Sequence, residues 1–516
     1  MTVKFEVFRS LYQDSVSLMQ IAASIRKQAN IEQASVVMGT ATNLQQLADA
    51  NLSEGVEAGP NDLVVAVRGS DEACDAALAL ARERLTARPA EMPGEAVREA
   101  PLTSLAMARE RTPQANMALI SVPGEYAAAE ALKALELGMH VMLFSDNVSL
   151  AQEKAVKTLA RERGLIVMGP DCGTAIVNGM PLGFANVVRR GGIGIVAASG
   201  TGLQEVSCRI DQLGFGISQA LGTGGHDLHE EIGGISMLYG IDALAQDPAT
   251  RVIVLVSKPP AADVAQRVLE RAQAARKPVV VNFLGAAPDS LQAPGIQVAT
   301  TLADAAECAV ALLAGTPLPD SAAQLDEHHA ATLGAMARAL PPGRRFLRGV
   351  FAGGTFCYET QLLCRDGGLT ASSNTPVAGN ARLADIWHSV GHTVVDMGDD
   401  DFTRGRPHPM IDPTLRDERM LAELLDPEVA VVVFDLVLGY GAAADPVAGI
   451  VAAIATARAG ESALPVMIAH VCGTENDPQV RSRQIEALRE AGVLVAGCNA
   501  QAARSAAHVA SLQATR

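Results

Sequence analysis

An apolar run that ends in a glycine-rich turn constrains the fold of this chain more than any other feature. Residues 194–198 read as a buried strand, Ser199-Gly200-Thr201-Gly202 reads as a tight turn, and a helix follows. Such a turn leaves the first backbone N–H groups of the helix without helical partners, with the positive end of the helix dipole behind them. A phosphate or carboxylate fits there. A plain turn capped by Ser199 or Thr201 is the alternative.

A second site of this kind is predicted downstream. The strand over 430–434 leads into residues 435–442, which contain Gly439 and Gly441, and a helix is expected over 445–457. Asp445 is a good N-cap and Pro446 suits the first helical position. We therefore expect a second set of free backbone donors near a strand's carboxyl end.

Strands and helices alternate along most of the 516 residues. This alternation predicts the α/β class, with several doubly wound parallel sheets of flavodoxin or Rossmann type. Two stretches rich in proline, 86–101 and 317–343, are expected to be linkers. The expected parts are a small N-terminal α/β module over 1–86, a truncated Rossmann-like domain over 105–190, and two flavodoxin-type domains over 191–316 and 344–516.

The last two domains read as distant copies of one another. In each, a Gly-Thr turn follows the first strand, at Gly200-Thr201 and at Gly353-Gly354-Thr355. A glutamate stands four residues after each threonine, at Glu205 and Glu359. Because ligands of doubly wound sheets bind at the carboxyl ends of strands, both turns are candidate binding sites.

Composition excludes several classes of function. A net charge of −16 and 3% aromatic residues argue against binding to nucleic acid or to an anionic membrane surface. No apolar run is long enough for a membrane span, and no signal peptide is indicated. The eight cysteines form no CxxC pair, and no histidine cluster has metal-ligand spacing, so we expect a reduced cytoplasmic protein without a metal site.

Three further positions are candidate site residues. Lys258 follows the strand 252–256, where it either pairs with a phosphate or is a solvated surface lysine. His226 follows a loop that contains Gly224 and Gly225, and it is either an acid, base or anion ligand or a loop-stabilising residue. The Gly473-Thr474-Glu475-Asn476 loop either offers backbone donors or is an ordinary capped turn. The acidic run over 396–401 is interpreted as a solvated loop and left out of the site.

Several of these motifs resemble the succinyl-CoA synthetase superfamily of NDP-forming acyl-CoA ligases. They are the Gly169-Pro170-Asp171-Cys172 turn, the Ser199-Gly200-Thr201 helix start with Glu205, the Gly222–Gly225 loop and the Gly473–Asn476 loop. Over 105–516 the chain is most similar to the FdrA branch, in which an alpha-type ligase domain and the C-terminal domain of a beta-type subunit are fused. The resemblance implies that two helix N-termini, at residues 199–201 and 435–442, face a phosphorylated group.

The chain departs from the family's pattern in three places. The Gly-rich CoA-binding loop has no counterpart, which argues against CoA binding. The segment after the strand 278–282, where the family has a phosphorylated histidine, reads Phe283-Leu284-Gly285-Ala286-Ala287-Pro288. Ser257-Lys258 stands where the family has a glutamate that steadies this histidine. An ATP-grasp domain is also missing, so nucleotide use would need another protein.

The resemblance links the chain to allantoin and purine breakdown, where a carbamoyl group passes between oxamate and phosphate. It implies a subunit of a carbamoyl- or acyl-phosphate-dependent transferase of the oxamate carbamoyltransferase type. Backbone donors would hold the phosphate, Lys258 would stabilise the leaving phosphate and His226 would transfer a proton.

Carbamoyl phosphate is then the expected substrate, and the residues specify no cofactor. Small anionic metabolites, other protein subunits and further copies of the chain are the expected partners. Two other functions stay open: an NDP-forming acyl-CoA synthetase of the succinate–CoA ligase kind, which is an acid–thiol ligase, and a non-catalytic scaffold or regulatory subunit.

Overall fold

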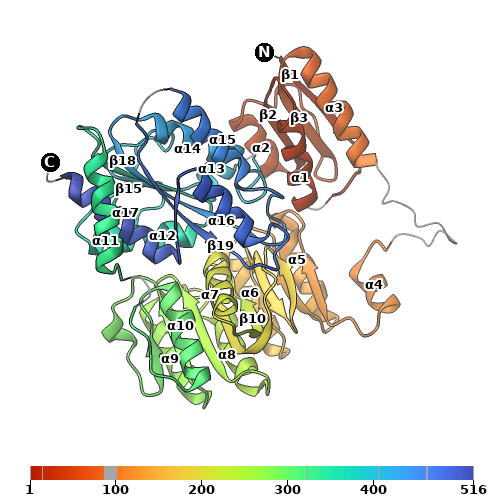
Figure 1. Cartoon of the computed structure of the whole chain (residues 1–516). Coiled ribbons are helices and arrows are strands. Elements are labelled where there is room, and N and C mark those ends of the chain that lie inside the picture. Colours follow the sequence, from red (N-terminus) through yellow and green to blue (C-terminus); the bar gives the residue numbers. More distant parts are fainter. Residues whose placement is uncertain are drawn as a thin grey trace. The chain divides into compact units, whose positions relative to one another are not determined.

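The computed structural model describes residues 2–13, 15–86, 102–321, 324–404, 406–460 and 463–514. The chain divides into two compact units (Figure 1). One unit contains Met1–Pro170 together with Thr403–Asp412, and the other contains Asp171–Phe402 and Pro413–Arg516. The predicted linker over 86–101 lies almost wholly outside the described residues. The α/β class predicted from the sequence is confirmed in both units.

The first unit begins with a three-stranded antiparallel sheet in the order β1-β3-β2. Successive residues of the central strand point to opposite faces, so Val65 and Val67 enter one core and Val64 and Ala66 enter another. Each of the three strands is followed by a helix, as the predicted α/β module requires. Their bounds are β1 (Thr2–Phe8), α1 (Ser15–Arg26), β2 (Ile31–Met38), α2 (Ala41–Asp49), β3 (Leu63–Gly69) and α3 (Asp71–Thr86).

A three-stranded parallel sheet in the order β4-β5-β6 follows in the same unit. Alanines of α5 and Val156 and Ala160 of α6 pack on it in one core. The bounds are α4 (Leu105–Arg111), β4 (Met117–Ile120), α5 (Gly124–Glu136), β5 (His140–Leu143), α6 (Leu150–Glu162) and β6 (Val167–Met168). Residues 403–412 complete the unit, with Arg26 of α1 3.5 Å from a carboxylate oxygen of Asp412.

The second unit contains two seven-stranded sheets. The first has the order β13-β12-β11-β9-β10-β7-β8, in which β9 to β13 are parallel and β7 and β8 form an antiparallel edge. The sequence pattern places residues 174–183 in the domain over 105–190. In the structure they form strands β7 and β8 of this sheet. The bounds are β7 (Thr174–Val177), β8 (Met180–Gly183), β9 (Arg190–Ala197), α7 (Gly200–Gln212), β10 (Ile217–Gly222), α8 (Ile235–Gln246), β11 (Val252–Ser257), α9 (Ala262–Ala274), β12 (Val279–Phe283), η1 (Pro288–Leu291), β13 (Ile296–Val298) and α10 (Leu302–Ala314).

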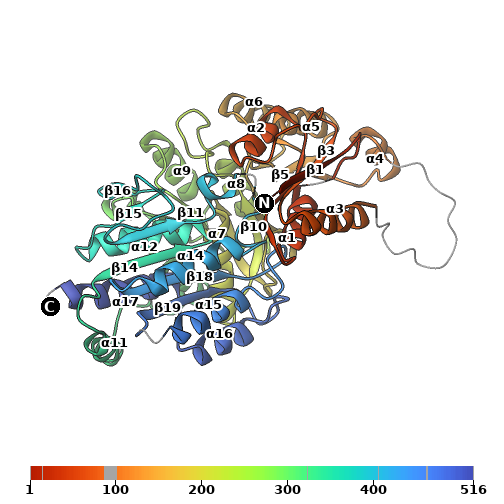
Figure 2. The ribbon, with the colours of Figure 1, turned by 90° about the horizontal axis from the view of Figure 1, so that it is seen from above.

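The second sheet is parallel throughout, in the order β16-β15-β17-β14-β18-β19-β20. Figure 2 shows β14, β18 and β19 side by side. Five neighbouring strands of this sheet, β20-β19-β18-β14-β17, are arranged like the strands β13-β12-β11-β9-β10 of the first sheet. In both sets of five, the strand that comes first in the chain lies between the second and the third. The bounds are α11 (Glu327–Ala339), β14 (Phe346–Phe351), α12 (Gly354–Asp366), β15 (Ser372–Ser373), β16 (Ala381–Arg382), β17 (Thr393–Asp396), α13 (Asp400–Thr403), α14 (Thr414–Leu425), β18 (Val429–Val437), α15 (Ala448–Ala459), β19 (Val466–Cys472), α16 (Arg481–Glu490), β20 (Leu494–Ala496) and α17 (Asn499–Ala514).

The helix predicted from Asp445 begins later than expected. Helix α15 starts at Ala448, after Val447 at the N-cap, and no side chain caps it. The carboxylate of Asp417 lies directly against Gly449, where a side chain would collide with it. The first turn of α15 is therefore packed against α14, which corrects the prediction that Asp445 caps an open helix start.

Two further facts bear on function. In the parts of the chain that the structure describes, no helix is long and apolar enough to cross a membrane. Cys172, in the Gly169–Cys172 turn, is buried, with its thiol 3.6 Å from the carbonyl of Thr174.

Candidate functional site

The starts of helices α7 and α12 lie against each other in the second unit. Ser199 caps α7 by accepting a 3.0 Å hydrogen bond from the amide of Gly202. The Ser199 hydroxyl lies 2.5 Å from the hydroxyl of Thr355, and the amide of Thr355 donates to Oγ1 of Thr201 at 3.4 Å. The structure thus brings together two turns that are about 150 residues apart in the sequence.

Backbone donors remain available at this junction. Among the described residues, no protein acceptor takes the amide hydrogens of Gly200, Thr201 or Gly354. The positive ends of two helix dipoles also meet here, which is unfavourable unless negative charge lies between them. The junction is therefore suited to an anion such as a phosphoryl group.

Two buried carboxyl groups flank the start of α12. Asp435, in β18, accepts hydrogen bonds from the amides of Ala352 at 2.8 Å and Gly353 at 2.7 Å. Burial raises the pKa of Asp435, although these two bonds lower it. The predicted strand 430–434 continues to Val437 in the structure, and this extension places the Asp435 carboxylate inside the protein.

Asp396, at the end of β17, is the second of these groups. One of its oxygens, Oδ1, accepts from the amide of Gly398 at 3.0 Å, and a Cβ built on Gly354 would lie 2.5 Å from the other, Oδ2. Burial raises the pKa of Asp396 to about 7, against the lowering effect of the Lys258 charge. The interpretation of Asp396 as part of a solvated loop is wrong, because all four residues of β17 are buried.

Lys258 reaches the same junction from the first sheet. It follows β11, and its ammonium lies 5.3 Å from the ring centroid of Tyr358, one turn into α12. Its positive charge lowers the pKa of Asp396. Lys258, Ser199–Gly202 and Gly353–Thr355 therefore lie in one region, as the copied turns suggested.

The remaining predicted glycine loops lie together elsewhere, along the side of α7. The amide of Tyr440, between Gly439 and Gly441, donates to the carbonyl of Ala185 at 3.0 Å, and the amide of Gly439 donates to Gln479 at 3.0 Å. A side chain on Gly441 would lie 2.7 Å from the ring of Phe184. The glycines of this turn thus permit close packing against residues 184–186.

The loop from Gly473 to Asn476 is closed by its own residues. The amide of Thr474 donates to Asp477 at 2.7 Å, and the amide of Asn476 donates to the Thr474 hydroxyl at 3.3 Å. Asp477 also accepts from the amide of Val187 at 2.7 Å. The backbone donors of Thr474 and Asn476 are therefore occupied within the protein, while Glu475 is exposed.

His226 lies in the exposed loop after β10, next to Gly224 and Gly225. Its ring centroid is 5.0 Å from that of His229. Between them, buried Asp227 accepts from the amides of Ser236 and Met237 and so holds the start of α8. A catalytic role for His226 stays a prediction.

Two buried glutamates cross between the sheets, and sequence analysis gave neither a role. Glu205 of α7 lies 2.7 Å from Nε2 of His470 in β19, and both side chains are almost completely buried. Burial favours a raised pKa for Glu205, but the charge and hydrogen bond of His470 outweigh it and lower the pKa. Glu359 of α12 accepts from the amide of Leu302 at 2.8 Å. The matched Thr-to-Glu spacing was the signal that could have identified this pair of contacts.

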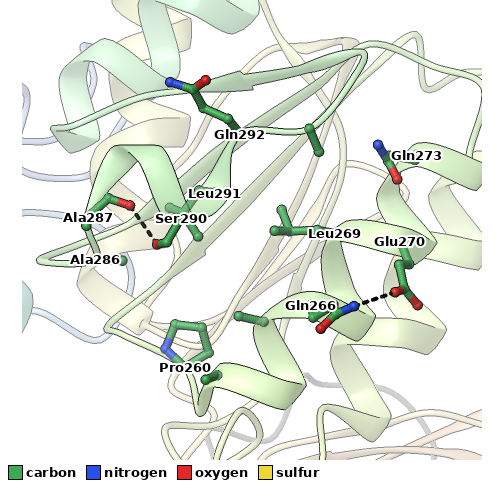
Figure 3. A pocket seen from close by; sticks show the side chains of 13 residues that line it. Pro260, Gln266, Leu269, Glu270, Gln273, Ala286, Ala287, Ser290, Leu291 and Gln292 are labelled. Carbon is green, nitrogen blue, oxygen red and sulfur yellow. Dashed lines mark hydrogen bonds between the residues drawn. The ribbon is translucent and has the colours of Figure 1, made fainter.

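A groove of about 550 Å³ lies on the first sheet's side of the second unit, between α9 and residues 286–293 (Figure 3). Its polar side chains bond locally, as Gln266 does to Glu270 at 3.0 Å and Ser290 to the carbonyl of Ala287 at 2.7 Å. None of the predicted site residues lines it.

Three family models match the chain. Residues 350–509 match a model described as CoA-ligase, and residues 189–285 match one described as CoA binding domain. Residues 1–101 match a model described as AllF, heavy metal-associated domain.

The residues of the N-terminal module do not fit a heavy-metal site. Residues 1–101 contain a single cysteine, Cys74, and no histidine. Cys74 is buried, with its thiol 3.6 Å from the carbonyl of Thr2. Among the described residues, no group of three or more His, Cys, Asp or Glu side chains could hold a metal ion.

The relatives agree with these matches. The chain is 44% identical to the protein YahF of Escherichia coli (strain K12) over 503 residues, which is 96% of each chain. It is 33% identical to the alpha-2 subunit of a mitochondrial succinate–CoA ligase (ADP-forming) of Trichomonas vaginalis, over 33% of this chain and 57% of that subunit. For the alpha subunit of the Aquifex aeolicus enzyme the identity is 31%, over 28% of this chain and 48% of that subunit. A solved structure from Pyrococcus horikoshii matches 78% of this chain and 84% of its own at 16% identity, with a TM-score of 0.32.

Proposed function

Because the chain belongs to the FdrA family, a branch of the succinyl-CoA synthetase-like, NDP-forming acyl-CoA ligases, we propose that it transfers a carbamoyl or acyl group to or from phosphate. The phosphoryl group binds at the junction of α7 and α12. The transfer is of the oxamate carbamoyltransferase type in purine and allantoin breakdown, and this chain is one subunit of the assembly that performs it.

The observation that carries this proposal is the meeting of two helix starts beside a cation. Among the described residues the amides of Gly200, Thr201 and Gly354 have no protein acceptor, and the hydroxyls of Ser199 and Thr355 join the two helix starts. These groups sit on the ends of buried strands, so they are held in place before a ligand arrives. Fixed donors of this kind suit phosphoryl and acyl-phosphate chemistry, which depends on positioning and charge stabilisation.

Each residue then has a defined part in the transfer. When an acceptor nitrogen attacks the carbonyl carbon, an N–C bond forms, the bond from that carbon to the phosphate oxygen breaks, and phosphate leaves with the electron pair. The proton lost from the nitrogen passes to the departing phosphate or to water. Lys258 and the amides of α7 and α12 stabilise the negative charge of the departing phosphate. The chain's own groups thus favour departure of phosphate without a phosphorylated histidine in the segment 283–288.

An acid–thiol ligase is the second candidate. The matches to CoA-ligase and CoA-binding models and to succinate–CoA ligase subunits support it. This activity would need a nucleotide site from a partner subunit. In this reaction the acyl group passes to the thiol of CoA rather than to an amino group.

Ligand titration of the thermal unfolding transition separates the candidates. At about 100 times its dissociation constant a ligand stabilises the folded protein by about 2.7 kcal/mol. We expect carbamoyl phosphate and inorganic phosphate to raise the transition temperature of the full chain, and CoA to leave it unchanged. Lys258→Ala should reduce the shift with phosphate, whereas Lys154→Ala, an exposed lysine of α6, should not.

Each other result has a definite meaning. A shift with CoA alone would support the ligase and contradict the transferase. No shift with any of the three ligands would favour a non-catalytic role. An equal shift for Lys258→Ala and wild type would remove Lys258 from the phosphate site.

A further inference from the structure

Asp396 has one carboxylate oxygen that the protein does not use. Its Oδ1 is held by the amide of Gly398, but in the described part of the chain no donor reaches Oδ2. The residue is only 7% exposed. Because Oδ2 is not among the buried atoms without a partner, water still reaches it in the free protein. A ligand that covers Oδ2 must replace this water with an N–H group or leave the oxygen unpaired, which is costly.

The free oxygen points at the start of α12. A Cβ on Gly354 would lie 2.5 Å from Oδ2, so the oxygen lies directly beside the first residue of the helix. The open amide of Gly354 and the hydroxyl of Thr355 belong to the same turn. A ligand whose phosphate occupied the junction would therefore have its other end close to Oδ2.

Both a cation and other carboxyl groups lie near Asp396. Lys258 approaches from the first sheet, Asp399 lies three residues further along the chain, and Asp435 accepts from the amide of Gly353, next to Gly354. Burial and the two other carboxyl groups raise the pKa of Asp396 to about 7, while Lys258 and the Gly398 amide lower it. The carboxylate form, which accepts hydrogen bonds only, therefore dominates above neutral pH.

We propose that Asp396 makes the site selective for acyl phosphates whose carbonyl carbon bears an amino group, by accepting an N–H hydrogen bond from that group at Oδ2. This inference rests on the proposed function, because it assumes that the phosphoryl group lies at the starts of α7 and α12. The ligand class is a carbamoyl phosphate rather than an alkyl acyl phosphate.

Carbamoyl phosphate and acetyl phosphate test this directly, since they differ only in an NH₂ or a CH₃ group of similar size. A site built to bond an N–H group rejects the analogue that lacks it, because the buried acceptor is then left unpaired. We expect the full-length protein to bind carbamoyl phosphate at least 10-fold more tightly than acetyl phosphate in calorimetric titration at pH 8. The preference should become smaller at pH 6, where Asp396 is mostly protonated.

Asp396→Asn is the matching variant. Because the Gly398 amide needs an acceptor, the side-chain oxygen of the asparagine should take the place of Oδ1. The asparagine NH₂ group then takes the place of Oδ2 and faces the NH₂ group of carbamoyl phosphate, so that two donors oppose each other. We expect the affinity for carbamoyl phosphate to fall at least 10-fold, with the affinities for acetyl phosphate and inorganic phosphate unchanged. Asp366→Asn, at the exposed far end of α12, is the control and should behave as wild type.

The outcomes distinguish this inference from the function on which it rests. Equal binding of the two acyl phosphates to the wild-type protein overturns the selectivity, whatever the variant does, and leaves the phosphate site standing. Binding of neither compound, nor of inorganic phosphate, overturns both. If Asp396→Asn does not fold, the wild-type preference and its dependence on pH still decide the question.

Discussion

The carboxyl group of Glu359 is buried and yet forms no ion pair with any residue that the structure describes. Its Oε1 accepts from the amide of Leu302 at the start of α10, and its Oε2 accepts from the side-chain amide of Asn499 at 2.8 Å. Burial raises its pKa to about 7, although both hydrogen bonds lower it. The carbonyl oxygen of Asn499 is buried without a partner. Both observations favour a protonated, neutral Glu359 in the folded protein.

This raised pKa predicts a dependence of stability on pH. A folded-state pKa of about 7, against 4.5 for the ordinary group, means that the folded protein binds the proton more tightly. The benefit is complete below about pH 4.5 and is lost as the pH rises to about 7, by at most about 3 kcal/mol. Glu359→Gln, which stays neutral, should lack this loss.

Thermal unfolding of the two proteins between pH 5 and 8 checks this prediction. The transition temperature of wild type should fall relative to that of Glu359→Gln as the pH rises. Glu490→Gln, an exposed position at the end of α16, is the control for general charge effects. Parallel profiles for wild type and Glu359→Gln would contradict the assignment of a buried neutral carboxyl group.

At the scale of elements, the two helix starts have the same sequence pattern but different surroundings. A Cβ on Gly200 of α7 would meet only the hydroxyl of Thr174, at 3.5 Å, whereas a Cβ on Gly354 of α12 would lie 2.5 Å from the Asp396 carboxylate. The first glycine is therefore replaceable. At Gly354, the missing side chain leaves the space that the Asp396 carboxyl group occupies.

A matched pair of alanine variants tests this difference. Gly200→Ala should leave the free energy of unfolding unchanged or raise it by up to about 1 kcal/mol, because alanine favours helix over glycine. Gly354→Ala should lower it by about 1–3 kcal/mol, because the new methyl group displaces a buried carboxylate. Urea unfolding of both variants measures the two effects. Equal changes in the free energy of unfolding would show that the start of α12 accommodates a methyl group as easily as the start of α7.

The strands were predictable because their buried residues form short apolar runs with turn residues at both ends. The relation between the two copied domains was also readable, from Thr201 and Glu205 recurring as Thr355 and Glu359. Their meeting was not, because a hydroxyl contact between Ser199 and Thr355 depends on how two complete sheets pack.

The remaining site residues show why local patterns are insufficient. Gly439 and Gly473 look like phosphate-binding glycines, but they serve close packing against Ala185 and Leu438. A glycine-rich turn after a strand has the same sequence in both cases, and only the neighbouring chain distinguishes them. Asp396 was misread for a similar reason: an acidic run usually lies in solvent, and only its first member is at the end of a buried strand.

At the scale of the whole molecule, residues 403–412 are the structural surprise. They come from the middle of the second sheet's domain, but they belong to the unit that contains the N-terminal module. Asp412, whose side chain is fully buried, pairs with Arg26, and partial burial lowers the pKa of His408 to about 4. This segment therefore depends on residues of α1 for its environment.

Removal of residues 1–101 should expose this segment to protease. The shortened chain loses Arg26, so we expect trypsin to cleave after Arg404 at least 10-fold faster than in the full chain. Mass spectrometry of timed digests identifies the cut, with cleavage after Arg338 in α11 as the internal reference. An unchanged ratio of the two cleavages would mean that residues 403–412 hold their conformation without the module.

The same segment sets an order of events during synthesis. The first unit spans residues up to Pro170, but its last part leaves the ribosome only after Asp412 has been made. At about 5–20 residues per second this delay is roughly 10–50 s. The first unit therefore waits, incomplete, until most of the chain exists, and its completion reports that the first sheet of the other unit and strands β14 to β17 of the second have been synthesised.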